Sequence, residues 1–252
     1  MPDLPGAPPA RIVLGTMRLH ESGRSAEEWA DFFLAAHDLG VTTLHSSTEY
    51  ESFLLFRAIL ERLAARAPQV RFRHMVKLGA PHFDEDAFDA DRLHARVEDY
   101  RTRLGADCIA DVQWMWRHGV QDDDSRIERF LAAAPDIARA AQTLKDKGWI
   151  ERLLCFPYTP AFAAAAVDCR AIDGLAVYRN TEETGYDAAI DRAGALGKAC
   201  VVIRPFFGGK LLEHGADAVA LLRFALDKPA IESAVVSCSK LDRLEALIGG
   251  VA

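Results

Sequence analysis

The sequence predicts a single (β/α)8 TIM barrel with short loops and almost no C-terminal extension. Short runs of β-branched and apolar residues alternate with longer stretches of helical period along the whole 252-residue chain. There are eight such runs, and an eight-stranded barrel commonly takes about 250 residues. No low-complexity stretch or Pro/Gly-rich linker divides the chain, so residues 1–252 are expected to form one domain, with residues 1–9 flexible.

The eight expected strands are short apolar runs, each followed by polar or turn-forming residues. Repeated βα units favour a parallel sheet, and eight strands favour closure of that sheet into a barrel. In chain order the strands are Arg11–Leu14, Thr42–His45, His74–Lys77, Ile109–Trp116, Ile150–Cys155, Gly174–Tyr178, Ala199–Arg204 and Ser233–Ser237.

The segments between the strands have the periodicity of amphipathic helices. The first is Ser25–His37, in which Ser25 can cap the helix and acidic residues fill the first turn. Asp91–Leu104 and Ser125–Lys147 show the same periodicity. Pro135 lies inside the last of these and predicts a break or kink, because proline removes a helical hydrogen bond.

Composition excludes several classes of function. The chain has 30 Lys and Arg against 37 Asp and Glu, a net charge of −7, which argues against nucleic acid as a partner. Its cysteines are odd in number and lack a CxxC pair, so reduced thiols are expected. There is no basic, apolar leader and no apolar run of about 18 residues, so we expect a cytoplasmic protein without a membrane span.

Metal dependence is not expected either. Acidic and histidine residues gather between the third strand and the following helix, but their spacing matches no tight metal motif. Such acidic loops are usually solvated. The residues concerned are His82, Asp84, Glu85, Asp86 and His94.

The most informative pair of residues is Tyr50 and Lys77, at the ends of two consecutive predicted strands. This region resembles the part of the aldo-keto reductases that carries their catalytic tetrad. In that family an Asp ends the second strand, a Tyr follows five residues later, a Lys ends the third strand and a His ends the fourth. Tyr50 and Lys77 match, whereas the Asp position holds His45 and the His position holds Trp116.

The resemblance extends along nearly the whole chain and implies the family's barrel fold. It includes the first strand and its turn, the segments that lead into strands four and five, and the segment after strand seven. These are Arg11–Arg18, Tyr100–Asp107, Leu144–Arg152 and Arg204–Leu211.

The resemblance implies NADPH as cofactor, with altered contacts. Family members hold the nicotinamide amide with a Ser-Asn pair after strand five and a Gln in strand six. This chain has Phe156-Pro157 at the first place and Leu175 or Ala176 at the second. The nicotinamide contacts of the family are therefore expected to be missing.

A second cofactor contact is implied near the start of the last helix. The segment that grips the 2′-phosphate in the family corresponds here to residues 237–244, so Cys238, Lys240 and Arg243 are predicted to bind the cofactor. The alternative is that Lys240 and Arg243 are solvated charges at a helix start.

The replaced residues change the chemistry that the resemblance implies. In the family, Tyr protonates the substrate carbonyl, Lys lowers the pKa of that Tyr, Asp keeps the Lys charged, and His positions the carbonyl. His45 removes the anion, and a cationic His45 would lower the pKa of Lys77 further. Trp116 cannot titrate, so it can only shape or stack a ligand. Trp114 should share its face, so one of the two is expected in the core and the other in the pocket wall.

Basic residues cluster at or just beyond the predicted strand ends and suggest an anionic substrate. A cationic rim at the mouth of a cleft favours a phosphate, a carboxylate or a pyrophosphate. Among these residues, Arg179 and Arg204 are the strongest candidates for substrate contacts. The alternative is that several pair with loop acids such as Glu49, Glu182 and Glu183. The rim comprises Lys77, Arg117, His118, Arg179 and Arg204.

Three functions remain open from the sequence. The first is NADPH-dependent reduction of a carbonyl on a small anionic substrate, with Tyr50 as proton donor. The second is non-redox acid–base catalysis by Tyr50, Lys77 and His45, of dehydratase, isomerase or lyase type. The third is a non-catalytic binding or regulatory barrel. The short C-terminal segment also predicts a mouth that is open, or one completed by another copy or a protein partner.

Overall fold

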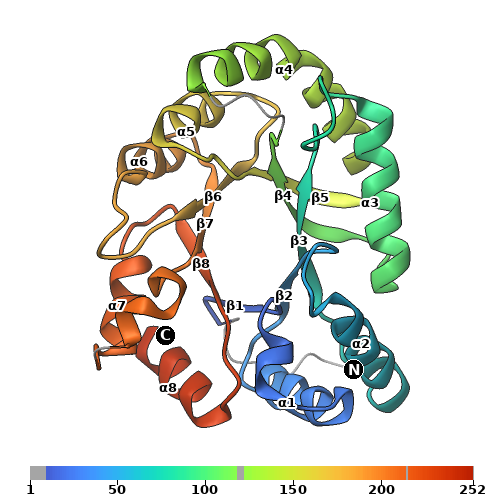
Figure 1. Cartoon of the computed structure of the whole chain (residues 1–252), viewed down its shortest axis with the longest axis vertical. Coiled ribbons are helices and arrows are strands. Elements are labelled where there is room, and N and C mark those ends of the chain that lie inside the picture. The colour runs from blue at the N-terminus through green and yellow to red at the C-terminus, as the bar shows by residue number, and fades with distance from the viewer. Residues whose placement is uncertain (1–9, 118–121, 214, 252) are drawn as a thin grey trace.

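The chain forms a closed barrel of eight parallel strands surrounded by helices (Figure 1). The computed structural model describes residues 10–117, 122–213 and 215–251; the expectation for residues 1–9 lies outside this range. The strands, in barrel order, are β1 Ile12–Gly15, β2 Thr43–Ser46, β3 Arg73–Gly79, β4 Ile109–Met115, β5 Ile150–Cys155, β6 Gly174–Tyr178, β7 Ala199–Ile203 and β8 Ile231–Val236. The predicted (β/α)8 fold is confirmed.

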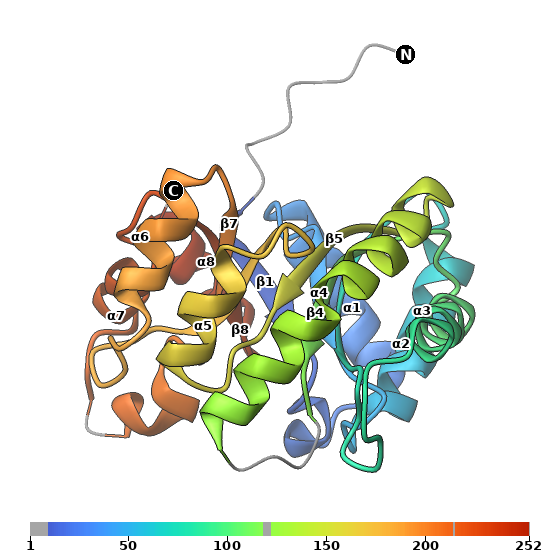
Figure 2. The same ribbon diagram turned by 90° about the horizontal axis from the view of Figure 1, so that it is seen from above.

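The described strands alternate with eight α-helices and two short 3-10 helices, and α8 follows the last strand. Figure 2 shows the α-helices packed around the barrel from the side. The α-helices are α1 Ala26–Asp38, α2 Phe53–Arg66, α3 Ala90–Leu104, α4 Asp123–Asp146, α5 Pro160–Val167, α6 Asp187–Ala195, α7 Ala218–Ala225 and α8 Leu241–Val251. The 3-10 helices are η1 Leu19–Ser22 and η2 Phe207–Leu212. No helix in the described ranges is both long and apolar enough to cross a membrane.

The ends of the first and fourth α-helices show how local sequence sets the boundaries. Ser25 caps α1 through a capping box: its hydroxyl accepts from the Glu28 amide, and Glu28 accepts from the Ser25 amide. Helix α4 runs through Pro135, so the break expected there is not a helix end. Leu131, whose carbonyl would have accepted the missing bond, is exposed, and water can satisfy that carbonyl.

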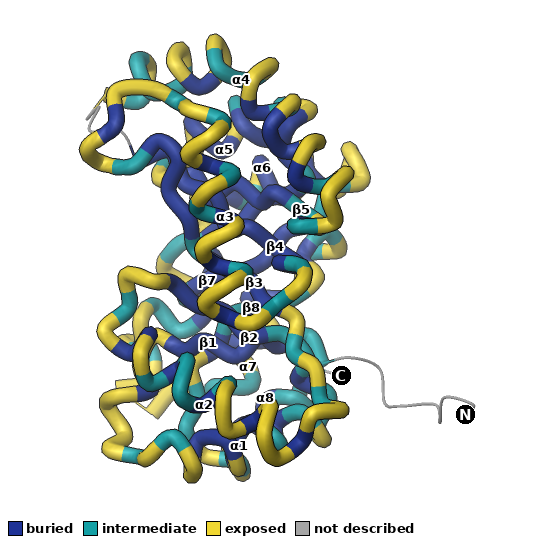
Figure 3. The backbone as a smooth tube through the Cα atoms, turned by 90° about the vertical axis from the view of Figure 1, so that its right-hand side faces the viewer, coloured by how far each residue is buried: buried dark blue, intermediate teal, exposed yellow. Residues whose placement is uncertain are grey.

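The core has two parts, separated by the barrel wall. Outward-facing strand residues pack against the inner faces of the helices, while the outer helix faces are exposed (Figure 3). A smaller apolar cluster fills the barrel itself and comprises Met75, Met115, Leu154, Phe156, Ala176, Val201 and Ile203. These inner residues follow the two-residue period of β-strands, so they also show which other side chains face inward.

An ion-pair network lies at the amino-terminal ends of the strands, below this cluster. Arg152 of β5 donates to Asp111 of β4 at 2.7 Å and to Glu232 of β8 at 2.8 Å. Asp111 is buried, and its pairing with Arg152 satisfies a charge that would otherwise be costly inside the barrel. The charged residues at this end therefore pair with one another and stabilise the barrel. A ligand is expected at the opposite end.

Gly174 tests the packing of the barrel wall. A Cβ at this position would lie 2.1 Å from the carbonyl oxygen of Ala199 and 2.9 Å from Cδ2 of Leu154. Gly174→Ala must therefore separate β6 from its neighbours, and we expect it to lower the free energy of unfolding by about 2 kcal/mol or more. Urea unfolding followed by circular dichroism measures this change.

The matched control is Gly249→Ala in α8, where a new Cβ would meet no atom within 4 Å. This variant should be neutral or stabilising by up to about 1 kcal/mol, because alanine favours a helix. Equal stabilities of the two variants would contradict the packing described for β6.

Candidate active site

A cavity of about 560 Å³ opens at the carboxyl ends of the strands. Its polar lining residues are Arg18, His45, Tyr50, Lys77, Gln113, Arg117, Arg204 and Ser237. Its larger apolar and aromatic lining residues are Met17, Phe83, Met115, Phe156, Tyr158, Tyr178, Ile203, Phe206 and Leu212. Sites form at this end of such barrels because all eight strands deliver side chains there.

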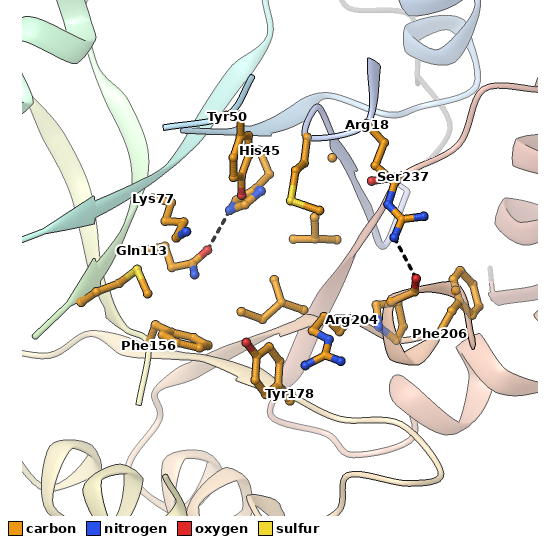
Figure 4. A pocket seen from close by; sticks show the side chains of 18 of the residues that line it. Arg18, His45, Tyr50, Lys77, Gln113, Phe156, Tyr178, Arg204, Phe206 and Ser237 are labelled. Atoms are coloured by element: carbon orange, nitrogen blue, oxygen red, sulfur yellow. Dashed lines mark hydrogen bonds between the residues drawn. The ribbon is translucent and has the colours of Figure 1, made fainter. Parts of the chain in front are cut away.

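Tyr50, Lys77 and His45 meet on one side of this cavity (Figure 4). The ring centroids of His45 and Tyr50 are 6.0 Å apart, and the Lys77 Nζ lies 5.6 Å from the Tyr50 ring centroid. A small ligand in the cavity can therefore contact all three side chains. This is the placement that the sequence predicts for them.

Hydrogen bonds from Tyr100 hold the loop before Tyr50 against the strand that carries Lys77. The Tyr100 hydroxyl, from α3, donates to the Lys77 carbonyl at 2.7 Å and accepts from the Thr48 amide at 2.9 Å. On the other side, the Ser52 hydroxyl donates to the Thr16 carbonyl at 2.7 Å. These contacts fix the loop between β2 and α2, and with it the position of Tyr50.

His45 is buried and paired with Gln113 of β4. The His45 Nε2 and the Gln113 Oε1 are 2.7 Å apart. Because an amide oxygen only accepts, this contact places the imidazole proton on Nε2 and leaves Nδ1 as an acceptor. Burial lowers the pKa of His45 to about 4. His45 is therefore neutral at physiological pH, and the cationic His considered from the sequence does not arise under these conditions.

Lys77 has a carboxylate partner after all, in Glu49. The Glu49 Oε2 lies 3.5 Å from the Lys77 Nζ. Burial and the neighbouring charge of Arg117 lower the pKa of Lys77, and Glu49 opposes both effects. The alternative raised from the sequence, that members of the cationic rim pair with loop acids such as Glu49, therefore holds for Lys77.

Tyr50 keeps its proton in this environment. Burial, with smaller contributions from Tyr100 and Glu49, raises the pKa of the Tyr50 phenol. No hydrogen bond joins Tyr50 to Lys77 among the described contacts. The hydroxyl is thus a neutral donor facing the cavity.

Trp114 and Trp116, of which one was expected in the core and the other in the pocket wall, both lie outside the barrel wall. Both are buried and pack with Phe130 of α4, at centroid distances of 5.8 and 6.4 Å. They do share a face, but it is the outward one, because Gln113 and Met115 of the same strand line the cavity. The correction is that Gln113, and not Trp116, brings a polar group of β4 to the site.

Arg179 also faces away from the cavity. It is buried, with ion pairs to Asp187 at 2.8 Å and Asp227 at 2.9 Å, and its guanidinium lies over the Phe224 ring. The preceding residue, Tyr178, is the one that lines the cavity, so alternation along the chain sends Arg179 outward. Its predicted substrate contact is not available in this structure.

The other members of the predicted cationic rim differ in their burial and in their ion pairs. Arg117 lines the cavity, but it is buried and forms a short ion pair with Glu49. Arg204 lines the cavity, is partly exposed, and stacks over the Tyr178 ring at 4.7 Å, with Glu183 at 3.5 Å. His118 lies outside the described residues.

The predicted 2′-phosphate contacts lie just beyond the cavity. Lys240 and Arg243 are exposed at the start of α8, immediately after the cavity residue Ser237. Cys238 is partly buried, its thiol donates to the Lys240 carbonyl at 3.2 Å, and burial raises its pKa. Cys238 is thus a neutral thiol whose contact is with its own loop.

Arg18 is an additional cation at the cavity that was not predicted from the sequence. Arg18 donates to the Gly208 carbonyl at 2.9 Å and so joins the turn after β1 to η2 (Figure 4). Gly208 and Gly209 both have positive φ, at 70° and 98°, and both line the cavity. Only glycine adopts these angles without strain, so the turn brings bare backbone to the cavity.

Phe156 forms an apolar wall at the place where the family resemblance implies a polar clamp. It is buried and lines the cavity, with its ring 5.3 Å from that of Tyr178 and 5.1 Å from that of Tyr158. The next residue, Pro157, uses its carbonyl to accept from the Tyr186 hydroxyl at 3.3 Å. This side of the cavity therefore offers stacking surface in place of hydrogen bonds.

Comparison with solved structures supports the family resemblance through the fold. A Pseudomonas aeruginosa protein assigned to the aldo-keto reductases superposes with a TM-score of 0.73 and 20% identity, over 96% of this chain and 88% of that one. The holo form of an aldo-keto reductase from Bacillus halodurans gives 0.69 and 18%, over 96% and 86%. A Klebsiella pneumoniae aldo-keto reductase in complex with NADPH gives 0.72 and 15%, over 96% and 85%.

Sequence searches give no such match. No family model matches the chain, and no curated protein sequence matches it. At identities of 15 to 20%, the structural likeness establishes that this chain has the aldo-keto reductase barrel fold.

The burial of His45 predicts a measurable loss of stability in acid. Its pKa is 6.5 in an unfolded chain and about 4 when folded, so between these values the unfolded state binds the extra proton. Stability is then complete above pH 6.5 and falls as the pH drops toward 4, by up to about 3 kcal/mol. His45→Gln should remove this part of the loss in urea unfolding measured across this pH range.

The buried His74, whose pKa burial also lowers to about 4, contributes a similar loss that His45→Gln leaves in place. His74→Gln should remove that second part of the loss. If the pH dependence of His45→Gln equals that of the wild type, His45 is not held neutral by burial.

Proposed function

We propose that this protein is an NADPH-dependent oxidoreductase of the aldo-keto reductase type, which reduces a carbonyl group on a small substrate. The observation that carries this proposal is the convergence of Tyr50, Lys77 and the Gln113 amide on one cavity at the barrel mouth. The fold likeness to an aldo-keto reductase in complex with NADPH supports the same assignment.

The residues around the cavity include groups that could bind the phosphates and the nicotinamide of NADPH. Arg18 supplies a guanidinium group, and the Gly208-Gly209 turn brings backbone within reach of a ligand. Lys240 and Arg243 are exposed beyond Ser237, where they would hold a 2′-phosphate. The rings of Phe156 and Tyr178 offer a stacking surface for the nicotinamide. NADPH, when bound, would supply the hydride.

The proton comes from Tyr50. Its phenol is un-ionised at neutral pH, so it can donate to a carbonyl oxygen as negative charge develops there. Lys77 lies beside the ring and provides positive charge on the same side of the cavity. A phenolate left on Tyr50 after proton transfer would be stabilised by this charge.

Gln113 would bind the substrate carbonyl through its neutral side-chain amide. Its oxygen is occupied by His45, and its amide nitrogen points into the cavity (Figure 4). An amide N–H can donate to the carbonyl oxygen without changing protonation state. We assign to Gln113 the positioning role that the resemblance implied for the fourth strand, although the position is different from the expected one.

The substrate is a small carbonyl compound with an apolar body and an anionic group. Aromatic and aliphatic side chains form most of the cavity wall. Arg204, partly exposed and only weakly paired with Glu183, is the cation best placed to meet a carboxylate or phosphate. Arg117 is less suited because Glu49 neutralises it.

A non-redox acid–base enzyme is the second candidate. The observation that favours it is Phe156-Pro157, whose side chains offer no amide or hydroxyl to a nicotinamide carboxamide. Tyr50, Lys77 and the free Nδ1 of His45 could then move protons on a substrate without hydride transfer.

NADPH oxidation by the wild type distinguishes these functions, and Tyr50→Phe tests the proton donor. With para-carboxybenzaldehyde and NADPH as probes, we expect the wild type to oxidise NADPH and the variant to lose at least about 100-fold in kcat, because the proton donor is gone. Tyr186→Phe is the matched control, since Tyr186 does not line the cavity among the described residues. The decrease in absorbance of the reduced nicotinamide measures the rate.

Retention of full NADPH oxidation by Tyr50→Phe would contradict the proposal. No NADPH oxidation by the wild type with a panel of aldehydes and ketones would instead favour the non-redox candidate or a non-catalytic binding role.

A further inference from the structure

We propose that Glu49 is the positioning residue for Lys77, and that it works as a shared carboxylate between Lys77 and Arg117. Glu49 lies in the loop between β2 and α2, directly before Tyr50. Its two oxygens have different partners. Oε2 faces the Lys77 Nζ at 3.5 Å, while Oε1 pairs with the Arg117 guanidinium and lies 3.2 Å from the His82 Nε2.

The Glu49 carboxylate provides the counter-charge for two cations that are close together at the cavity wall. Lys77 and Arg117 are both withdrawn from water, with side chains 23% and 3% exposed, and they are close enough to oppose each other's charge. Two such cations require a counter-charge nearby. Burial opposes ionisation of Glu49, but the hydrogen bond and charge of Arg117 lower its pKa overall, so Glu49 supplies that charge.

Both the carboxylate and Arg117 are held in place by their surroundings. The Glu49 amide donates to the Ser47 hydroxyl at 3.2 Å. Arg117 crosses the end of β3 at Gly79, where a Cβ would lie only 2.7 Å from the Arg117 Cδ. Its guanidinium then lies over the Phe83 ring, 5.1 Å from the centroid. The pair is therefore built before any ligand arrives.

The other titratable groups near Lys77 do not provide this charge. Those facing it from β2, the following loop, α3 and the end of β4 are His45, Tyr50, Glu49, Tyr100 and Arg117. His82 joins through Glu49. In this set Glu49 alone is a carboxylate, and His45 is neutral at physiological pH.

The consequence for catalysis rests on the proposed function. Removal of the anion from the wall should allow Lys77 to lose its proton at lower pH, because the neighbouring Arg117 charge is then unopposed. A neutral Lys77 would no longer stabilise a developing Tyr50 phenolate, so turnover would fall first at alkaline pH.

The test measures Lys77 directly and needs no substrate. Lysines of the whole protein are reductively methylated with ¹³C-formaldehyde, which preserves their charge, and their NMR signals are followed against pH. The Lys77 signal is assigned by its loss in Lys77→Arg. We expect Glu49→Gln to move the Lys77 midpoint to lower pH by about one pH unit or more. In Glu49→Asp, which keeps the negative charge, the midpoint should lie between that of Glu49→Gln and that of the wild type.

Two further variants make the outcome independent of general damage to the loop. Glu51→Gln removes an acid two residues away whose side chain is 82% exposed and faces His20, so the Lys77 midpoint should not move. Arg117→Gln removes the competing cation, so the midpoint should move to higher pH. A Lys77 midpoint in Glu49→Gln equal to that in Glu51→Gln would overturn the proposal.

The activity measurement separates this inference from the proposed function. With NADPH and para-carboxybenzaldehyde, the alkaline limb of the kcat profile should move to lower pH in Glu49→Gln, with little change in the KM for NADPH. A shifted Lys77 midpoint without any wild-type reduction would reject the reductase assignment and retain Glu49 as the partner of Lys77. Reduction by the wild type, with an unshifted Lys77 midpoint in Glu49→Gln, would retain the reductase assignment and reject Glu49 as the partner of Lys77.

Discussion

Each strand of the barrel sends every second side chain inward, and this constraint decides which residues can take part in chemistry. In β4 it selects Gln113 and Met115 and sends Trp114 and Trp116 to the helices. After β6 it places Tyr178 in the cavity and Arg179 in an ion-pair network outside it. The shape of the cavity and many of its polar groups follow from this alternation, and the loop after β2 adds Tyr50.

Compared with the family pattern, this site loses the acid at position 45 but has another carboxylate beside Lys77. A neutral imidazole stands where an acid would be expected from the resemblance, and a loop carboxylate faces the lysine from another direction. In the proposed reaction the Gln113 amide would bind the carbonyl, so Tyr50 is the group that has to give up a proton. A site of this kind depends less on a histidine titration than one with an imidazolium donor would.

Much of this could be predicted from sequence, for definite reasons. Strand runs, helix periodicity and the Ser25 cap are local signals, and they gave the barrel and its order. Tyr50, Lys77 and His45 fall at strand ends, and the topology brings them together. Trp114 and Trp116 were misplaced because matching motifs by position fixes the residue but not the direction of its side chain. The alternation Asp111, Gln113, Met115 carried that information.

The sequence offered Glu49 as a partner for the cationic rim, but it could not show which cation Glu49 would meet, nor predict other specific contacts between loops. Glu49 and Arg117 are 68 positions apart in the chain, and their pairing depends on how two loops fold over the same barrel mouth. The link from Arg18 to Gly208 spans 190 positions and arises for the same reason. Such contacts have no signature in spacing, because they are set by the closure of the barrel.

Calorimetric titration with NADPH separates a reductase from a protein that works without a nicotinamide. If the proposed function is correct, one NADPH binds per chain with saturation, and binding is weaker when Arg18 is replaced by Gln, since its guanidinium group lines the cavity. The absence of binding up to millimolar NADPH would contradict it, and the cavity would then belong to an enzyme or binding protein that works without a nicotinamide.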